Sequence, residues 1–188
     1  MSRTTIETVE ITPTEFEKQV RAWLEAASQG VKKFSVTHQK KLEGPGSEYQ
    51  FDAVAELEIL GGASIVILVE CKRYSPKNPI KRDVVMLLHA KIREVGAHKG
   101  MVFSTSHFQR GALEYAKRHG IATVLIQDGK ASYETKDRFR PPEPPPWRPN
   151  YKYIGRMLTW TEVGYRSHLI ADDYPDAIQE WLETYRDS

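Results

Sequence analysis

The sequence contains only one cysteine, Cys71, so it cannot form an intramolecular disulfide, and such sparse use of cysteine fits a reducing compartment. It also lacks a long hydrophobic run, because its longest aliphatic stretch, SIVILV at residues 64–69, is far too short to span a bilayer. The first residues, MSRTTIETVEITP, are polar and have no apolar signal-peptide core. From these absences we expect a cytoplasmic protein that has no membrane partner.

A strong net charge is missing as well. The formal net charge is +2, so total charge does not indicate nucleic acid binding, although the basic residues are unevenly distributed. The chain has no glycine-rich Walker loop, and its histidines do not have the spacing of zinc ligands. With 40% hydrophobic and 28% charged residues, the composition is that of a globular protein. Two basic clusters occur: Lys32, Lys33, His38, Lys40 and Lys41, and then Lys72, Arg73, Lys77, Lys81 and Arg82.

Hydrophobic periodicity predicts an α/β fold. A helix is expected after Thr12, with a capping box to Glu15, and two β-rich stretches, 31–42 and 48–59, are separated by the turn EGPGS. The second stretch has period two from Tyr49 to Ile59, which predicts one half-buried strand. Strand 63–72 is apolar on both faces, and strands and helices then alternate up to residue 127. That order predicts a mixed β-sheet flanked by helices, with parallel pairing in its second half.

The C-terminal part has a different composition. RPPEPPPWRP, at residues 140–149, contains too many prolines for a helix or a central strand, so we expect a stiff connector there. We therefore predict a main domain at 1–138, a proline-rich linker at 139–150 and an aromatic extension at 151–188 that ends in an amphipathic helix. About forty residues are few for an independent domain, so this extension should dock on the main domain or on a partner subunit.

The strand at residues 63–72 ends in charged residues. Residues two apart on a strand project to the same side, so Glu70 and Lys72 should lie together while Cys71 points into the opposite face. Asp52 comes from the preceding strand, which we expect to pair with this one. Two carboxylates at one end of adjacent strands can hold a hard cation such as Mg²⁺. A neighbouring ammonium can orient or deprotonate a metal-bound water, or neutralise charge that develops on a phosphoryl group.

The same pattern also occurs without catalysis, because Glu-x-Lys at a strand end is often only an ion pair. Glu17 is a further candidate, since it borders the apolar stripe of the first predicted helix. His89 and Lys91, near the apolar face of the predicted helix 79–96, could belong to the site or be ordinary surface and packing residues.

From Phe16 to Lys130 the sequence resembles the Mrr-like restriction endonucleases of the PD-(D/E)xK nuclease superfamily. The resemblance lies in FEKQV, YQFDAV, VECKRY and GAHKGMVFSTSHFQRGALEYAKRHGIATVLIQDG. It implies a restriction-endonuclease-like fold, in which Asp52 and Glu70 bind Mg²⁺ (Mn²⁺ as a substitute), Lys72 is catalytic and Glu17 is an additional acidic residue. Where many members have Gln, this chain has Glu70, and the glycine- and aspartate-rich turn before the aspartate is replaced by EGPGSEYQFD.

The function that follows is a metal-dependent DNA endonuclease with no small-molecule cofactor. Because double-strand cleavage usually needs two active sites, the resemblance also suggests a homodimer. A non-catalytic DNA-binding or assembly module with the same fold, and a structure-selective nuclease similar to Holliday junction resolvases, are the alternatives. The residues expected to contact DNA phosphates are Lys40, Lys41, Arg73 and Lys77.

Overall fold

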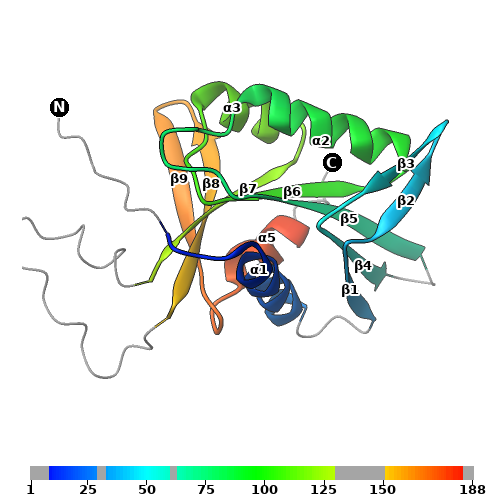
Figure 1. Ribbon diagram of the computed structural model, residues 1–188, viewed down its shortest axis with the longest axis horizontal. Coiled ribbons are helices and arrows are strands. Elements are labelled where there is room, and N and C mark those ends of the chain that lie inside the picture. The colour runs from blue at the N-terminus through cyan, green and yellow to red at the C-terminus, as the bar shows by residue number, and fades with distance from the viewer. Residues whose placement is uncertain (1–8, 29–32, 60–62, 130–150, 184–188) are drawn as a thin grey trace, which may run out of the picture.

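The computed structural model describes residues 9–28, 33–59, 63–129 and 151–183. A seven-stranded mixed sheet has the order β1-β4-β5-β6-β7-β8-β9, and a separate two-stranded sheet consists of β2 and β3. Helices α1 and α5 cover one face of the large sheet, and α2 and α3 cover the other (Figure 1). The predicted mixed sheet flanked by helices is therefore confirmed. The strands of the large sheet are β1 (Phe34–His38), β4 (Ala53–Ile59), β5 (Ala63–Lys72), β6 (Lys99–Ser104), β7 (Ala122–Asp128), β8 (Tyr153–Thr161) and β9 (Gly164–Ile170).

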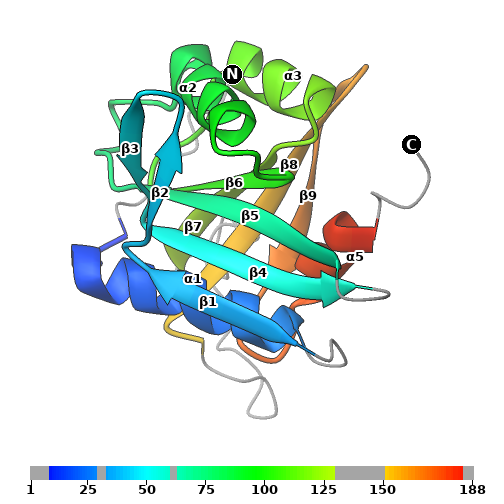
Figure 2. The same ribbon diagram turned by 90° about the vertical axis from the view of Figure 1, so that its right-hand side faces the viewer.

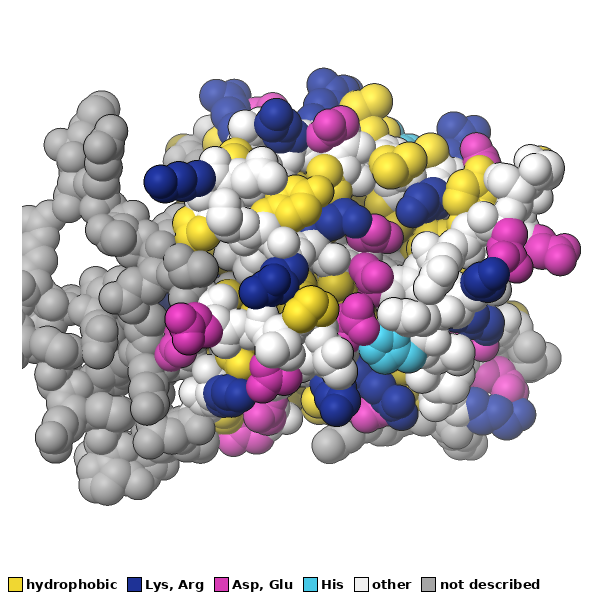
Figure 3. All heavy atoms as spheres, viewed as in Figure 1, with side chains coloured by type: hydrophobic (Ala, Val, Ile, Leu, Met, Phe, Trp, Pro, Cys, Tyr) yellow, Lys and Arg dark blue, Asp and Glu magenta, His cyan; other side chains and the backbone are white. Residues whose placement is uncertain are grey.

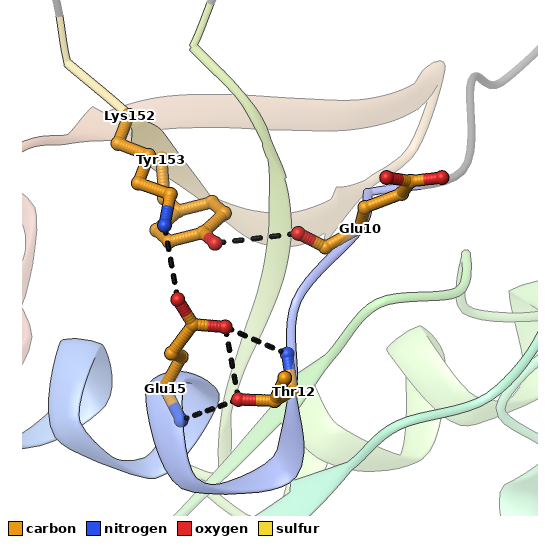
Figure 4. A network of polar contacts seen from close by, with 5 residues as sticks. All are labelled: Glu10, Thr12, Glu15, Lys152 and Tyr153. Atoms are coloured by element: carbon orange, nitrogen blue, oxygen red, sulfur yellow. Dashed lines mark hydrogen bonds and ion pairs between the residues drawn. The ribbon is translucent and has the colours of Figure 1, made fainter.

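Helix α1 (Pro13–Ala27) begins where its sequence predicts. The Thr12 hydroxyl accepts a hydrogen bond from the Glu15 amide, and the Glu15 carboxylate accepts one from the Thr12 amide, which completes the capping box. Lys152 contacts the same carboxylate at 3.0 Å, and Tyr153 donates to the Glu10 carbonyl (Figure 4). The Thr12 backbone hydrogen bond, together with Lys152, lowers the pKa of Glu15 to about 2. The start of α1 is thus joined to the start of β8.

The second half of the sheet has the predicted parallel pairing. Strand β5 pairs with β6, and β6 with β7, in parallel. The connections contain α2 (Arg82–Glu94) and α3 (Arg110–Arg118), which pack on the same face of the sheet (Figure 1). Strand β5 is an interior strand, and at its centre Ile67, Leu68 and Val69 are buried on both faces, in agreement with its apolar sequence.

The first half of the sheet differs from the sequence prediction. Each of the two β-rich stretches forms two strands, β1 and β2 (Lys41–Gly44) in the first, and β3 (Ser47–Gln50) and β4 in the second, where a single strand was expected. The break occurs where Gln39 has a φ of 43° and donates its amide to the Asp52 carbonyl at 2.9 Å. The β2–β3 hairpin therefore leaves the plane of the large sheet and lies beside α2 (Figure 2).

The break also changes which side chains share a face. Phe51 packs in the core beneath α2 and α3, whereas Ala53 and Ala55 pack in the core beside α1. A single alternating strand would have put all three on one face, so the prediction of an uninterrupted period was wrong. Val54 is also fully buried, so the first half of β4 is covered on both faces rather than half-buried as expected.

The C-terminal part of the chain adds to the main sheet. Strand β8 pairs antiparallel with β7, β9 pairs antiparallel with β8, and α5 (Asp176–Glu183) packs beside α1. Residues after the proline-rich stretch thus dock on the main sheet, one of the two predicted arrangements. The linker 139–150 lies outside the described residues, and the division at 138 and 150 stays a prediction. Within the described ranges, no helix is long and apolar enough to cross a membrane.

Candidate active site

The ends of β4 and β5 bring Asp52, Glu70 and Lys72 together. Antiparallel pairing places Ala53 opposite Val69, so Asp52, just before β4, lies beside the last residues of β5. The Asp52 carboxylate accepts a hydrogen bond from the Cys71 backbone amide at 2.6 Å. Asp52 is therefore fixed to the strand that carries the other two residues. The Gly61–Gly62 turn expected between the strands lies outside the described residues.

Glu70 and Lys72 project to the same side of β5, as the two-residue period predicts. The Lys72 ammonium donates to Oε1 of Glu70, and their side chains are only 26% and 16% exposed. Burial disfavours the charged lysine, but the hydrogen bond to Glu70 and the charges of Glu70 and Asp52 outweigh it and raise the pKa of Lys72. Lys72 is thus an ammonium at neutral pH. The Cys71 side chain packs against the core beside α1, and burial raises its pKa.

Asp52 lies in an environment that disfavours its charge. Burial raises the pKa of its carboxyl, and the negative charge of Glu70 raises it further. The Cys71 amide, Lys72 and His38 act in the opposite direction but do not outweigh these effects. A carboxyl group whose pKa is raised by burial and by a neighbouring carboxylate is a favourable environment for a cation.

Glu17 reaches the same region through His38. The His38 imidazole Nε2 lies 2.8 Å from Oε2 of Glu17, and His38 is opposite Ala53 in the pairing of β1 with β4. After burial, the charges of Asp52, Glu17 and Glu70 contribute to the raised pKa of Cys71, so each of these carboxylates lies near this residue of β5. His38 was predicted only as part of a basic cluster. The position of His38 in the alternating pattern of β1 does not indicate that its side chain contacts Glu17 on α1.

Of the two residues that the sequence left open on α2, Lys91 joins the site. Its ammonium lies 3.9 Å from Oε2 of Glu70 and 5.4 Å from the centroid of the Phe51 ring. His89 instead contacts α3, where its Nδ1 is 2.9 Å from the Tyr115 hydroxyl and its ring packs against His119. His89 is therefore explained by the packing of α2 on α3.

The basic residues expected to contact DNA are not equivalent. Lys40 contacts Glu56 and Lys41 contacts Glu48, each at 2.6 Å, so both are already paired with carboxylates. Arg73 uses its Nε to donate to the Ile11 carbonyl at 2.7 Å, which anchors the segment before α1. Lys77 is exposed in the loop after β5. The space-filling view shows acidic side chains gathered beside a histidine, with basic side chains on both sides (Figure 3).

The donor set fits a hard divalent cation. Within the described part of the chain, no group of three or more His, Cys, Asp and Glu side chains could hold a metal ion. Asp52 and Glu70 are the two carboxylates that could hold such an ion, since Mg²⁺ commonly binds through one or two carboxylates while it retains several waters. Burial and the negative charge of Glu70 raise the pKa of Asp52, and a cation bound beside Asp52 would offset both effects.

Replacement of Asp52 by Asn should stabilise the metal-free protein at neutral pH. A raised pKa means that the folded state binds the proton of Asp52 more tightly than the unfolded state, so the ionised carboxylate reduces stability above its ordinary pKa of 3.8. The Asn oxygen can still accept the Cys71 hydrogen bond. Since Asp52 is partly exposed, the free energy of unfolding should rise by less than about 1 kcal/mol. This corresponds to a rise in Tm of at most about 2–4 °C at pH 7.

Thermal melts in EDTA at pH 7 and pH 3.5 test this expectation. The difference between Asp52→Asn and wild type should become smaller at the lower pH, where the carboxyl of the wild type is mostly protonated in both states. Asp83→Asn, which removes an exposed carboxylate from α2, should not raise the Tm. A Tm of Asp52→Asn that is equal to or below that of wild type at pH 7 would contradict the assignment of an unfavourable charge.

Comparison with known proteins agrees with this geometry. A family model described as "Restriction endonuclease" (Mrr_cat) matches residues 8–131, about two thirds of the chain, so the chain belongs to the Mrr_cat restriction endonuclease family. This membership confirms the resemblance seen in the sequence and identifies residues 8–131 as a restriction endonuclease domain. Restriction endonuclease domains generally use divalent metal ions and act on DNA. No curated protein matches the chain.

Two solved structures are similar to parts of the chain. One is a protein of unknown function, AF1548, with 20% identity and a TM-score of 0.42 over 54% of this chain and 56% of that chain. The other is the DNA modification-dependent restriction endonuclease AspBHI, with 16% identity and a TM-score of 0.32 over 63% of this chain and 33% of that chain. The match thus spans about half of the first structure and a third of the second.

Proposed function

We propose that this protein is a divalent-metal-dependent DNA endonuclease of the Mrr type, which hydrolyses phosphodiester bonds at the end of β5. The observation that carries the proposal is the convergence of Asp52, Glu70 and Lys72, where the Cys71 amide holds Asp52 beside the strand that bears the other two. We propose that Asp52 and Glu70 hold the metal, with Mg²⁺ as the physiological ion and Mn²⁺ as a substitute. When bound, such a cation lowers the pKa of a water and polarises a phosphoryl oxygen.

Lys72 acts in this proposal as a cation rather than as a base. Its raised pKa keeps it protonated at neutral pH, and a general base would have to lose that proton first. An ammonium beside the metal-binding carboxylates can orient the attacking water. It can also stabilise the negative charge that develops on the phosphoryl oxygens as water attacks phosphorus and a P–O bond breaks.

Glu17 is proposed as an acidic residue that acts through its neighbour. Because its Oε2 is held by His38, Glu17 is oriented toward the side of the site next to Asp52. His38 therefore serves as a positioning residue for Glu17.

The DNA backbone is proposed to lie across the basic residues around the site. Lys77 is exposed, and Lys41 would exchange its contact with Glu48 for a phosphate. The same exchange applies to Lys40 and Glu56, while Arg73 has guanidinium donors besides the Nε that binds Ile11. A cytoplasmic location and a homodimer are part of this proposal, since two active sites would serve the two strands of a duplex.

Incubation with supercoiled plasmid tests the function. We expect nicked and linear products with Mg²⁺ or Mn²⁺, and none when EDTA is added. Asp52→Asn should lose cleavage, because one of the two proposed metal-binding carboxylates is gone. The matched control is Glu58→Gln, since Glu58 lies at the other end of β4, pairs with Lys33 at 2.7 Å and should be dispensable.

The result distinguishes the proposed nuclease from the alternative functions. If wild type binds DNA but cuts no plasmid, linear duplex or branched DNA with any divalent metal, the protein is a non-catalytic DNA-binding module. Preference for a branched substrate would instead identify a structure-selective nuclease.

A further inference from the structure

Glu70 has a lysine on each of its carboxylate oxygens. Lys72, from the same strand, donates to Oε1, and Lys91, from α2, lies 3.9 Å from Oε2. The side chains of Lys91 and Glu70 are only 18% and 16% exposed, so water screens this pair less than a surface ion pair. A metal that binds Glu70 therefore has to compete with an ammonium that faces the same carboxylate.

The two lysines differ in how firmly they hold Glu70. A separation of 3.9 Å is too long for a hydrogen bond, so the attraction of Lys91 is electrostatic, whereas Lys72 makes a direct hydrogen bond. Lys91 also has a second favourable neighbour, because its ammonium lies 5.4 Å from the centroid of the Phe51 ring. Lys91 is thus the cation that can leave Glu70 at the smaller cost.

Apart from Glu17, which is paired with His38, the charges around Glu70 balance without any metal. Asp52 and Glu70 carry two negative charges, and Lys72 and Lys91 carry two positive charges, so these four side chains sum to zero when all are ionised. A divalent cation would raise this sum to two positive charges in a partly buried place, unless an anion arrives with it. A phosphate of the DNA backbone is such an anion, and it is also an alternative partner for Lys91.

We infer that Lys91 restrains metal binding in the free protein and makes it cooperative with DNA binding. Lys91 is then a positioning residue: it occupies Glu70 until a backbone phosphate draws its ammonium away and leaves Oε2 to the metal. The inference rests on the proposed function, and it explains why the metal would bind to the site mainly when DNA is present. By linkage, the metal must strengthen DNA binding by the same factor as DNA strengthens metal binding.

Mn²⁺ binding to the full chain tests the inference without reference to cleavage. Free Mn²⁺ is measured by electron paramagnetic resonance for wild type, Lys91→Met and Lys91→Gln, first without DNA. Lys91→Met keeps an unbranched side chain of similar length beside Phe51 but removes the charge, and Lys91→Gln is the second variant in case Met disturbs folding. Arg93→Gln is the matched control, because it removes one positive charge from an exposed position of the same helix.

Both Lys91 variants should bind Mn²⁺ about 5-fold more tightly than wild type, the upper end of the range for a partly screened charge pair. Arg93→Gln should stay within about twofold of wild type, since an exposed charge is screened. The titration is then repeated with a phosphorothioate duplex, which keeps the backbone charge but resists hydrolysis, after correction for Mn²⁺ bound by the duplex alone. The duplex should tighten Mn²⁺ binding by wild type more than by either Lys91 variant.

Equal or weaker Mn²⁺ binding by the folded Lys91 variants overturns the inference, as does an equal effect of the duplex on all proteins. If wild type nevertheless binds Mn²⁺ and cleaves plasmid, the proposed function stands and only the role of Lys91 is wrong. If no variant binds Mn²⁺ and wild type cleaves nothing, both the role of Lys91 and the metal-dependent function are overturned.

Discussion

Replacement of Lys72 by Met is expected to reduce DNA cleavage by about 10³-fold or more, which is the range for loss of a group that stabilises charge in a transition state. Lys72 is the ammonium in direct contact with Glu70, and its raised pKa keeps it charged at the pH of the reaction. Because its effect falls on the transition state, DNA affinity should change by only a few-fold. Single-turnover cleavage of a labelled duplex and binding of the same duplex in EDTA measure the two effects separately.

The effect of this substitution on folding has a defined sign. The pKa of Lys72 is raised in the folded state above its ordinary value of 10.5, so its charge contributes fully to stability at pH values below 10.5. This contribution disappears as the pH rises through the folded-state pKa. The side chain is partly exposed, so the loss at pH 7 should be about 1 kcal/mol, and saturating Mg²⁺ should restore part of it.

Lys33→Met is the control for Lys72→Met. It removes a lysine that contacts Glu58 at 2.7 Å, with 72% of the lysine side chain exposed, at the end of β4 remote from Asp52. This variant should cleave DNA at the rate of wild type. If Lys72→Met retained more than about a tenth of the wild-type rate, Lys72 would be an ion-pair partner of Glu70 rather than a catalytic residue.

Replacement of Trp23 by Ala is expected to lower the free energy of unfolding by about 3–5 kcal/mol, the range for deletion of a large buried aromatic side chain. Trp23 is fully buried on α1 and stacks on Phe103 of β6 at a centroid distance of 6.4 Å. Its ring also packs against Gly155 of β8, where a Cβ atom would lie 3.1 Å from Cζ3 of Trp23. The substitution would therefore open a cavity between α1, the parallel strands and the C-terminal strands.

Urea denaturation at pH 7 measures this loss, and two further variants separate its causes. Asp172→Ala removes the carboxylate that accepts from Trp23 Nε1 at 3.1 Å and from Gln19 at 2.6 Å, and it should cost under about 1.5 kcal/mol. Trp23→Phe keeps an aromatic ring, so its loss in the free energy of unfolding should lie between the losses for Asp172→Ala and Trp23→Ala. A cost below about 1 kcal/mol for Trp23→Ala would mean that β8 and β9 do not depend on α1 for their place in the sheet.

Several features of the fold could be read from the sequence because they depend on residues close together in the chain. The capping box between Thr12 and Glu15 spans one helical turn, and the buried positions of α1 are those of its predicted apolar stripe. Glu70 and Lys72 share one side of β5 because alternation within a strand is a property of the backbone. The order of strands and helices from β5 to β7 predicted parallel pairing through helical connections.

The break beside Asp52 could not be read in this way. The residues from Tyr49 to Ile59 have a continuous period of two, yet the strand changes direction between Gln50 and Ala53. The break depends on a pair of backbone hydrogen bonds to the neighbouring stretch, one from Gln39 to Asp52 and one from Phe51 to Lys40. A non-glycine residue with positive φ, Gln39, has no strong sequence signal.

The sequence shows which chemical groups are available and that Glu70 and Lys72 are neighbours at the end of a buried strand, with Asp52 in the stretch before it. The packing of the folded chain is what brings His38 of β1 to Glu17 of α1, turns Lys91 of α2 toward Glu70, and adds β8 and β9 to the sheet. Each of these contacts joins elements whose separation in the chain is not fixed by any local period. They arise because α1 and α2 pack their apolar faces on opposite sides of one sheet, which brings the polar edges of both helices to the end of β5.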